Sequence, residues 1–293
     1  MRRHIMPSSR ILPEFELLLP ESVAEAVKML KKHKADATIM AGGTDVIVSG
    51  TQGFITPYVI SLSKIKGIDT VKFSKTGGLR IGAMATLQKV ADDKDVQKMY
   101  PALFKSAAIN GTPQIRNMGT VVGNVLRASP SGDCACALLA IGAKIVFEGP
   151  RGKREVSIDD FFIDYKKTAR KVDELAVEIK VPAPKKGEVS AFNRITRTTL
   201  DLSKINAAVS LVVEKGVCKS ARIAMGAVAP KTIRLTDTEK LLKGQKITGS
   251  ILEAIVASVV GQISPIDDVR STADYRNQVS PVLLRRTIEE AIA

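Results

Sequence analysis

The sequence predicts an α+β protein of two domains. Its 293 residues, 45% of them apolar, are enough for two hydrophobic cores rather than one. Beyond residue 187 the expected strands precede the expected helices, an order typical of an α+β domain whose sheet is covered by helices on one face. The stretch from Pro182 to Gly187 is the best boundary, and we expect domains at 1–182, with subdomains of about 1–62 and 63–182, and at 188–293.

Local signals define the elements of the first domain. Ser22 and Glu25 form a capping box that begins an amphipathic helix. Gly77-Gly78 indicates a hairpin between two of the buried strands, which are expected over 37–41, 58–62 and 79–84. Further helices are expected over 86–91, 100–109 and 134–140.

The same signals continue to the end of the chain. The turn chemistry of 149–152 predicts a hairpin between strands at 144–148 and 154–158. Alternating apolar residues predict a strand over 175–181, which Pro182 ends. After the boundary we expect three strands and then three helices, at 190–197, 205–214, 220–228, 236–243, 250–263 and 281–292.

Two glycine-bearing turns, far apart in the chain, are the strongest functional signal. The first is Ala-Gly-Gly-Thr-Asp-Val at 41–46, and the second runs from Thr120 through Gly123-Asn124 to 129–133. Glycine permits a positive φ and lets backbone N–H groups approach a ligand closely, as a phosphate oxygen requires. A single Gly-Gly turn is more often ordinary loop geometry, but both turns follow apolar segments and carry Thr and Asp. Together they leave two interpretations open, a diphosphate cradle and ordinary loop geometry.

These turns resemble the two FAD loops of the molybdenum hydroxylase flavoproteins, which include the medium subunit of aerobic carbon monoxide dehydrogenase and the FAD domain of xanthine dehydrogenase. Segments 15–26 and 265–276 resemble the family's entry strand and helix and its C-terminal signature. The resemblance implies a two-part FAD-binding domain of the vanillyl-alcohol-oxidase type and a smaller C-terminal domain with a three-stranded sheet and helices. The sequence has neither a G-x-G-x-x-G fingerprint nor a P-loop, which fits FAD in such a different fold.

The resemblance also implies which residues contact the cofactor. In the second loop Val122 replaces the first glycine of the family's usual Thr-Ile-Gly-Gly-Asn, which affects how closely the backbone can approach the diphosphate. The expected contacts are Met40, Ala41, Gly42, Gly43, Thr44, Asp45, Val46, Gly119, Thr120, Gly123, Asn124, Ser129, Asp133, Leu175 and Arg194.

Three of these residues have a structural alternative. Asp133 matches the carboxylate that bonds the adenosine ribose, but it also suits the N-cap of a helix that begins at the next residue. Leu175, or Ala176 one step further, matches the apolar residue near the isoalloxazine ring, and the alternative is an inward-facing strand residue. Arg194 stands where relatives often carry a lysine that would stabilise the anionic reduced flavin; the alternative is a solvated arginine at a strand edge.

Histidine and cysteine content excludes several other functions. The two histidines, His4 and His33, lie outside the motifs, which argues against a His-based triad, metal centre or acid–base set. Three cysteines make neither a disulfide framework nor a four-ligand metal site, and they fit a reducing compartment, so we expect a cytoplasmic protein. Cys134 and Cys136 are expected to be small buried helix residues rather than ligands.

The formal net charge of +14 raises the possibility of nucleic-acid binding. The basic residues are scattered, however, and aromatic residues make up 4% of the chain, so we expect solvated faces, some of which steer an acidic partner or an anionic acceptor. No apolar run reaches the length of a membrane span, and the basic start at 1–3 is followed by polar residues and proline at 7–10. We therefore expect no nucleic acid, no membrane span and no export.

The sequence therefore predicts an electron-transfer flavoprotein subunit. The resemblance implies a molybdopterin-binding large subunit that hydroxylates the substrate, a [2Fe-2S] small subunit that relays electrons, and FAD on this chain that passes them to an external acceptor. A dimer of heterotrimers is expected, with no catalytic side chain on this subunit. Two alternatives stay open: a stand-alone FAD oxidoreductase of the same fold, against which the 270–276 signature argues, and a basic non-catalytic binding protein that has lost FAD.

Overall fold

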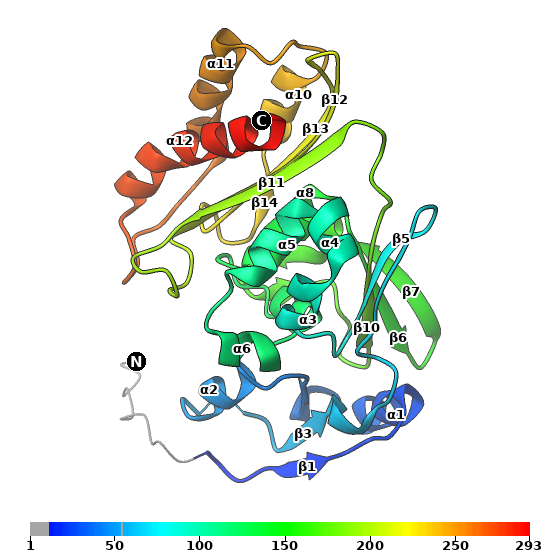
Figure 1. The fold of residues 1–293 in the computed structure, drawn as a ribbon. Helices are drawn as coiled ribbons and strands as arrows, with labels where there is room; N and C mark the ends of the chain where they lie inside the picture. Colours follow the sequence, from blue (N-terminus) through cyan, green and yellow to red (C-terminus); the bar gives the residue numbers. More distant parts are fainter. Residues whose placement is uncertain (1–11, 54) are drawn as a thin grey trace.

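The computed structural model describes residues 12–53 and 55–293. Its elements form three layers that follow one another along the chain, from a small sheet at one end to the C-terminal sheet and helices at the other (Figure 1). The segment from Met1 to Arg10, to which the export prediction refers, lies outside the described residues.

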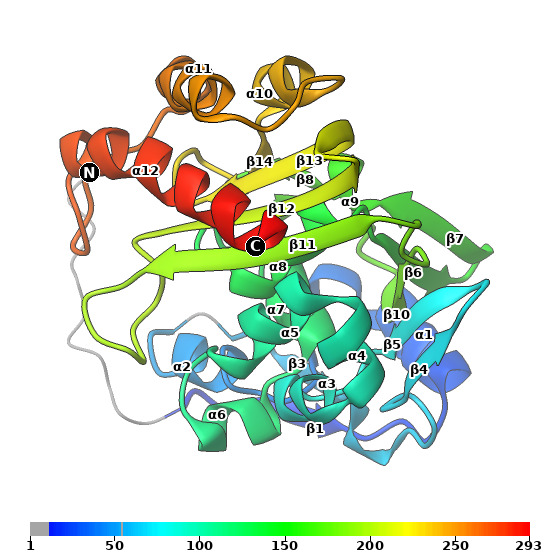
Figure 2. The same ribbon diagram turned by 45° about the horizontal axis from the view of Figure 1, so that its top comes forward.

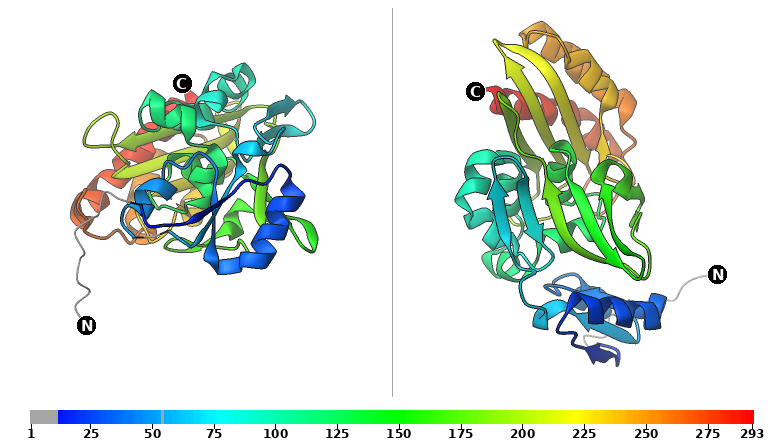
Figure 3. Two further views of the ribbon diagram at one scale, coloured as in Figure 1. Left: turned by 90° about the horizontal axis from the view of Figure 1, so that it is seen from below. Right: turned by 90° about the vertical axis from the view of Figure 1, so that its right-hand side faces the viewer.

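The first layer is a small parallel sheet with helices beside it. Its strands run in the order β1 (Glu16–Leu18), β3 (Tyr58–Ser61), β2 (Ala37–Met40). Ser22 caps the first helix as predicted, since its side chain accepts from the backbone N–H of Glu25 at 3.2 Å. Figure 3 shows this layer at one end of the molecule. Its helices are α1 (Val23–His33), η1 (Lys34–Asp36), α2 (Val46–Gly50) and η2 (Leu62–Lys64).

The second layer is built on an antiparallel sheet of five strands. Gly78, with φ +74°, turns the chain into a hairpin as predicted, but it pairs strand 78–82 with 71–74 and not with 58–61. The prediction was wrong because strand 58–61 pairs in parallel within the first layer. In spatial order the strands are β4 (Val71–Ser74), β5 (Gly78–Gly82), β10 (Leu175–Val181), β6 (Lys144–Gly149) and β7 (Gly152–Ser157).

Short helices pack on this sheet and carry most of the second layer's core. Helix 133–140 is buried along its whole length, as its run of small and apolar residues predicted. Several helices between residues 94 and 126 were not predicted. The elements are α3 (Leu87–Asp92), α4 (Lys94–Met99), α5 (Pro101–Ala108), α6 (Pro113–Met118), α7 (Val121–Leu126), α8 (Asp133–Ala140), α9 (Ile158–Phe161), β8 (Phe162–Asp164) and β9 (Lys167–Thr168).

The C-terminal layer is an antiparallel sheet with three helices. The three predicted strands are present, and a short fourth strand, β14, is added at the edge. The last helix begins at Ala273, where Thr272 is its N-cap, rather than at the predicted Pro281. The elements are β11 (Glu188–Ile195), β12 (Ile205–Glu214), β13 (Val217–Gly226), β14 (Ile233–Arg234), α10 (Thr236–Leu242), α11 (Gly249–Val259), η3 (Val260–Gln262) and α12 (Ala273–Ile292).

The helices of the C-terminal layer cover one face of its sheet, as predicted, and helices of the second layer cover the other face. Helices α10 and α12 pack on one side, and α5 and α8 of the second layer pack on the other (Figure 2). Residues 205–212 of β12 are consequently all buried. A strand that is buried on both faces has a continuous apolar run instead of an alternating one, as Ala207-Ala208-Val209 illustrates.

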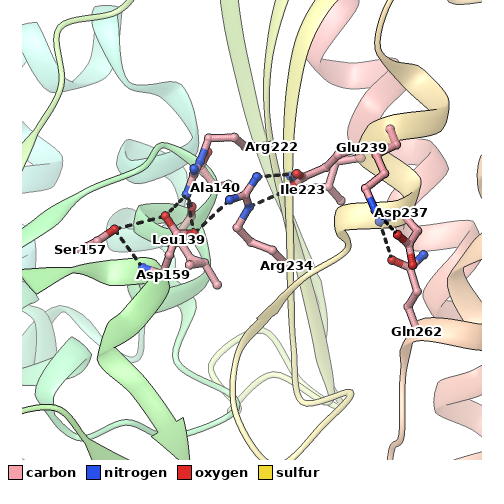
Figure 4. A network of polar contacts seen from close by, with 11 residues as sticks. Leu139, Ala140, Ser157, Asp159, Arg222, Ile223, Arg234, Asp237, Glu239 and Gln262 are labelled. Atoms are coloured by element: carbon pink, nitrogen blue, oxygen red, sulfur yellow. Dashed lines mark hydrogen bonds and ion pairs between the residues drawn. The ribbon is translucent and has the colours of Figure 1, made fainter.

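Two polar junctions tie the second layer to the C-terminal sheet. We call the first the cavity-side junction, where Arg194 of β11 pairs with Asp133 of α8 at 2.6 Å. The second, the far junction, is drawn in Figure 4: Asp159 of α9 accepts from Arg222 at 2.8 Å and from Arg234 at 3.1 Å. The two junctions hold the opposite ends of α8, because Arg222 also donates to the carbonyl oxygens of Leu139 and Ala140.

Candidate functional site

Both glycine turns line one cavity of about 620 Å³, which also borders β10 and the loop between β11 and β12. A volume of this size is typical of a small-molecule or cofactor site. The first turn follows β2 and leads into α2, and the second lies where α6, α7 and α8 meet. The chain thus brings together two segments that are far apart in the sequence.

At Gly42 the first turn touches Met118 and Gly119, the residues that lead into the second turn. A Cβ atom at this position would lie 1.7 Å from the carbonyl oxygen of Met118 and 3.0 Å from the backbone nitrogen of Gly119, so no other residue fits without moving one turn. The next residue, Gly43, has φ +76°, a conformation that glycine adopts without strain. Glycine is therefore required here by the contact between the turns as well as by the backbone conformation.

The second turn is the start of a helix rather than an open loop. Thr120 is the N-cap of α7, and its hydroxyl accepts from the N–H of Gly123 at 2.9 Å. Val122 is 3% exposed and belongs to the core of the second layer while also bordering the cavity. The valine that departs from the glycine pattern is thus accommodated by core packing.

Unused hydrogen-bonding groups face the cavity from both turns. Among residues 12–53 and 55–293, the backbone N–H groups of Gly42, Gly43, Thr44 and Asp45 have no protein acceptor. On the opposite turn, Asn124 Oδ1 is buried without a hydrogen-bond partner in the described part of the chain. Buried polar groups are almost always paired, so the buried Asn124 Oδ1 fits a ligand that donates to an amide oxygen. Residues 42–44 are half-buried and Asp45 is exposed, and their free N–H groups line the same cavity, where they fit an acceptor.

Asp133 and Arg194 line the cavity but are occupied by each other and by their neighbours. The carboxylate of Asp133 also accepts from Ser203 at 2.6 Å and from Asn206 at 2.8 Å. Burial raises the pKa of Asp133, while Arg194, Ser203 and Asn206 act in the opposite direction. Arg194 also donates to the carbonyl of Thr199, so its charge is satisfied within the protein.

Both structural alternatives for this pair are corrected. The N-cap of α8 is Gly132, and Asp133 is its first residue, so the interpretation of Asp133 as the cap is wrong by one position. The side chain of Arg194 is 7% exposed, so it is not a solvated edge arginine although β11 is an edge strand. Both side chains are instead engaged in the ion pair between the layers, which no local pattern encodes.

The remaining predicted residues divide into those that line the cavity and one that does not. Leu175 and Ala176 both border it, at 1% and 2% exposure, so the geometry leaves that pair of alternatives open. Met40 is not among the lining residues; its Sδ atom lies 3.3 Å from where a Cβ of Gly43 would be. The other predicted residues on the cavity wall are Ala41, Gly42, Gly43, Thr44, Asp45, Val46, Gly119, Thr120, Gly123, Asn124 and Ser129.

Several residues on the cavity wall were missed by sequence reasoning. Arg127, Lys166 and Arg170 add positive charge, and Leu200 and Leu202 add apolar surface from the β11–β12 loop. Arg127 lies within the second turn, between Asn124 and Ser129, and its position beside those residues is the signal that could have found it. The others lie in segments without a recognisable motif, and their position depends on how the layers pack.

Cys134 and Cys136 are buried in α8, as the sequence predicted. Burial raises the pKa of Cys134 to about 12 and raises that of Cys136 well above its usual value, so both thiols stay protonated. Within residues 12–53 and 55–293 no cluster of three or more His, Cys, Asp or Glu side chains is arranged to bind a metal. Across the same ranges, none of the helices combines the length and apolarity that crossing a bilayer requires.

Two family models together match almost the whole chain. The FAD binding domain in molybdopterin dehydrogenase matches residues 13–184, and the CO dehydrogenase flavoprotein C-terminal domain matches residues 190–291. The first of these covers the two layers that form most of the cavity wall, and the second covers the C-terminal sheet and helices, including the β11–β12 loop that completes the wall.

Individual relatives agree with these matches over nearly their full length. The carbon monoxide dehydrogenase medium chain of Hydrogenophaga pseudoflava is 30% identical over 284 residues, which cover 97% of this chain and 99% of the relative. The xanthine dehydrogenase FAD-binding subunit of Escherichia coli O157:H7 is 28% identical and covers 93% of this chain and 94% of its own.

Solved structures confirm the fold. A chain of the Hydrogenophaga pseudoflava carbon monoxide dehydrogenase superposes with a TM-score of 0.93 at 30% identity, covering 96% of this chain and 98% of that one. A chain of quinoline 2-oxidoreductase from Pseudomonas putida 86 gives 0.89 at 26% identity with the same coverage, 96% and 98%.

Proposed function

This chain belongs to the family of FAD-binding subunits of the carbon monoxide and xanthine dehydrogenase type, and from that premise we propose that it is the electron-transfer subunit of a molybdenum hydroxylase. In this proposal a molybdopterin-binding large subunit oxidises the substrate and a [2Fe-2S] small subunit relays the electrons. The FAD of this chain passes them to an external acceptor. The names "medium chain" and "FAD-binding subunit" of the relatives support this division of roles. The proposed assembly is a cytoplasmic dimer of heterotrimers.

The cavity between the glycine turns is the proposed FAD site. The unpaired N–H groups of residues 42–45 suit the diphosphate oxygens, because hydrogen bonds to a charged acceptor are strong. Met40 is proposed to support Gly43 from behind rather than to touch the cofactor. The proposed contacts are Ala41, Gly42, Gly43, Thr44, Asp45, Val46, Gly119, Thr120, Gly123, Asn124, Ser129, Asp133, Leu175 and Arg194.

The protein's part in this chemistry is positioning. When bound, FAD supplies the redox reaction of its isoalloxazine ring, and the surrounding residues fix its place and its electrostatic environment. The buried apolar atoms of Leu175 and Ala176 would keep water away from their side of the cavity. The proposed domain boundary falls between residues 182 and 188, which the ends of the two family matches at 184 and 190 support.

The direct contact between the turns at Gly42 carries the proposal and supplies its test. In Gly42→Ala the new Cβ would overlap the carbonyl oxygen of Met118, at 1.7 Å, and the turns would be forced apart. We expect FAD affinity, measured by titrating apoprotein and following flavin fluorescence, to fall about tenfold or more. Gly249→Ala is the control, since nothing lies within 4 Å of its Cβ position. Circular dichroism checks that both variants are folded, and unchanged affinity in folded Gly42→Ala would contradict the proposed site.

Purification of the native complex tests the proposed role. We expect the chain to co-purify with two other subunits, and the complex to contain molybdenum and iron besides flavin. A chain that is isolated alone with bound FAD and reduces a substrate by itself would instead be the stand-alone oxidoreductase. A colourless chain that does not bind added FAD would instead be the positively charged, non-catalytic binding protein.

A further inference from the structure

The charges on the cavity wall do not balance. Four basic side chains line the cavity, and three carboxylates accompany them. Each carboxylate already has an arginine partner among the described residues: Asp45 with Arg127 at 3.3 Å, Asp133 with Arg194 at 2.6 Å, and Asp201 with Arg197 at 2.9 Å. The two remaining cations on the wall are Lys166 and Arg170.

Arg170 is the more enclosed of these two cations. It lies between β9 and β10, and its Nη1 atom donates to the carbonyl oxygens of Lys171 at 3.2 Å and Glu174 at 3.0 Å. No carboxylate of residues 12–53 or 55–293 lies within 4.0 Å of its guanidinium. The remaining donors of the guanidinium, Nε and Nη2, have no acceptor in that part of the chain.

The nearby carboxylate of Glu174 does not neutralise Arg170. Arg154 binds both of its oxygens in a bidentate ion pair, with Nε and Nη2 each donating at 2.7 Å. Burial lowers the pKa of Arg170, and the charge of Glu174, which acts in the opposite direction, offsets only part of this effect. A desolvated charge without a partner is costly, and proteins retain one where a ligand supplies the opposite charge.

We propose that Arg170 is the principal anion-binding side chain of the cavity, taking a negatively charged group of FAD. The inference rests on the proposed function and moves the free cation from Arg194, where the sequence placed it, to Arg170. The negative charge has two sources within FAD, the diphosphate and the charge that the ring gains on reduction. Nη1 of Arg170 donates to the carbonyl of Glu174, the residue before Leu175, and both Arg170 and Leu175 line the cavity.

Charge removal with a matched control tests the proposal. In Arg170→Gln we expect the dissociation constant for FAD to rise about tenfold or more, or the midpoint potential of bound flavin to fall. Arg170→Lys retains the positive charge, so it should show a smaller change than Arg170→Gln. Lys167→Gln removes the same charge from a neighbouring exposed residue that does not line the cavity, and should change neither quantity. Thermal unfolding of the apoprotein should be unchanged or occur at a higher temperature in Arg170→Gln, because the unpaired cation is gone.

The readouts distinguish the two sources of charge and the possible failures. Weaker binding of both ADP and FAD assigns Arg170 to the diphosphate, whereas a lower potential with unchanged ADP binding assigns it to the ring. Unchanged FAD affinity and potential in Arg170→Gln, or an equal change in Lys167→Gln, would overturn the inference. A lower unfolding temperature of the apoprotein with unchanged FAD affinity would make Arg170 a structural residue. If wild-type apoprotein itself fails to bind FAD, the proposed function fails first.

Discussion

The cavity-side junction and the far junction are both arginine–carboxylate ion pairs, but they differ in how deeply their side chains are buried. Each joins arginines of the C-terminal sheet to a carboxylate of the second layer. In the cavity-side junction the side chains of Arg194 and Asp133 are 7% and 4% exposed, whereas Arg222 and Asp159 in the far junction are 29% and 32% exposed. The far junction also has a second arginine on the same carboxylate. The two junctions should therefore differ in the free energy of unfolding that is lost when one partner is removed, in the salt dependence of that loss, and in their effect on the cavity.

The comparison explains how the C-terminal sheet shapes a cavity made mostly by other layers. Helix α8 begins at the cavity with Asp133 and ends at the carbonyls that Arg222 binds, where the partial negative charge of a helix end favours a cation. One end is fixed by a buried ion pair, in which removing either partner would leave an uncompensated buried charge. The other is fixed by a partly hydrated network that has redundancy.

The largest effect is expected from Arg194→Met. The substitution leaves Asp133 buried without its cation, and removing one partner of a buried pair costs about 3–5 kcal/mol in the free energy of unfolding. The loss should be smaller at acidic pH, because a protonated Asp133 carries no charge. Urea denaturation of the apoprotein measures it. Asp133→Asn in the same chain should recover part of the loss, and strict additivity of the two substitutions would contradict the coupling. Arg197→Met is the exposed control.

A smaller effect, about 1 kcal/mol, is expected from Asp159→Asn, because its pair is partly exposed. Burial tends to raise the pKa of Asp159, but Arg222 and Arg234 together lower it below the usual value of 3.8. A carboxyl whose folded pKa is lowered contributes stability above its unfolded pKa and loses that contribution as pH falls through the folded value. The difference between wild type and variant should thus be constant near neutral pH and shrink below pH 3.8. A difference that grew on acidification would refute this sign.

The smallest effect is the response of the two junctions to salt. Raising the salt concentration from about 0.1 M to about 1 M shortens the screening length from roughly 10 Å to 3 Å. The stability lost in Asp159→Asn should shrink in high salt, since the hydrated pair is screened. The loss in Arg194→Met should persist, because buried charges are screened much less. If the stability lost in the two variants changed equally with salt, the proposed difference in hydration between the junctions would be wrong.

Local chemistry made part of this molecule predictable. The helix cap at Ser22, the hairpin turn at Gly78 and the two glycine turns each follow from properties of a few adjacent residues, and all appear where expected. The prediction at Pro281 was wrong because proline is favoured in the first turn of a helix, yet here it lies inside α12, which begins at Ala273.

What escaped prediction depends on contacts between layers. The pairing of Asp133 with Arg194 joins residues that are far apart in sequence, and neither position signals its partner. Arg170 has no carboxylate partner in the described part of the chain because the nearby carboxylate of Glu174 is paired with Arg154. Such features follow from packing, which residue types and spacing do not specify.

The shared C-terminal sheet has a consequence for dividing the molecule. Its inner face rests on α5 and α8, so a fragment cut between residues 182 and 188 would turn buried groups such as Phe192 and Ala208 toward water. Grafting the C-terminal sheet and its helices onto a relative would therefore require helices beneath the sheet that match α5 and α8.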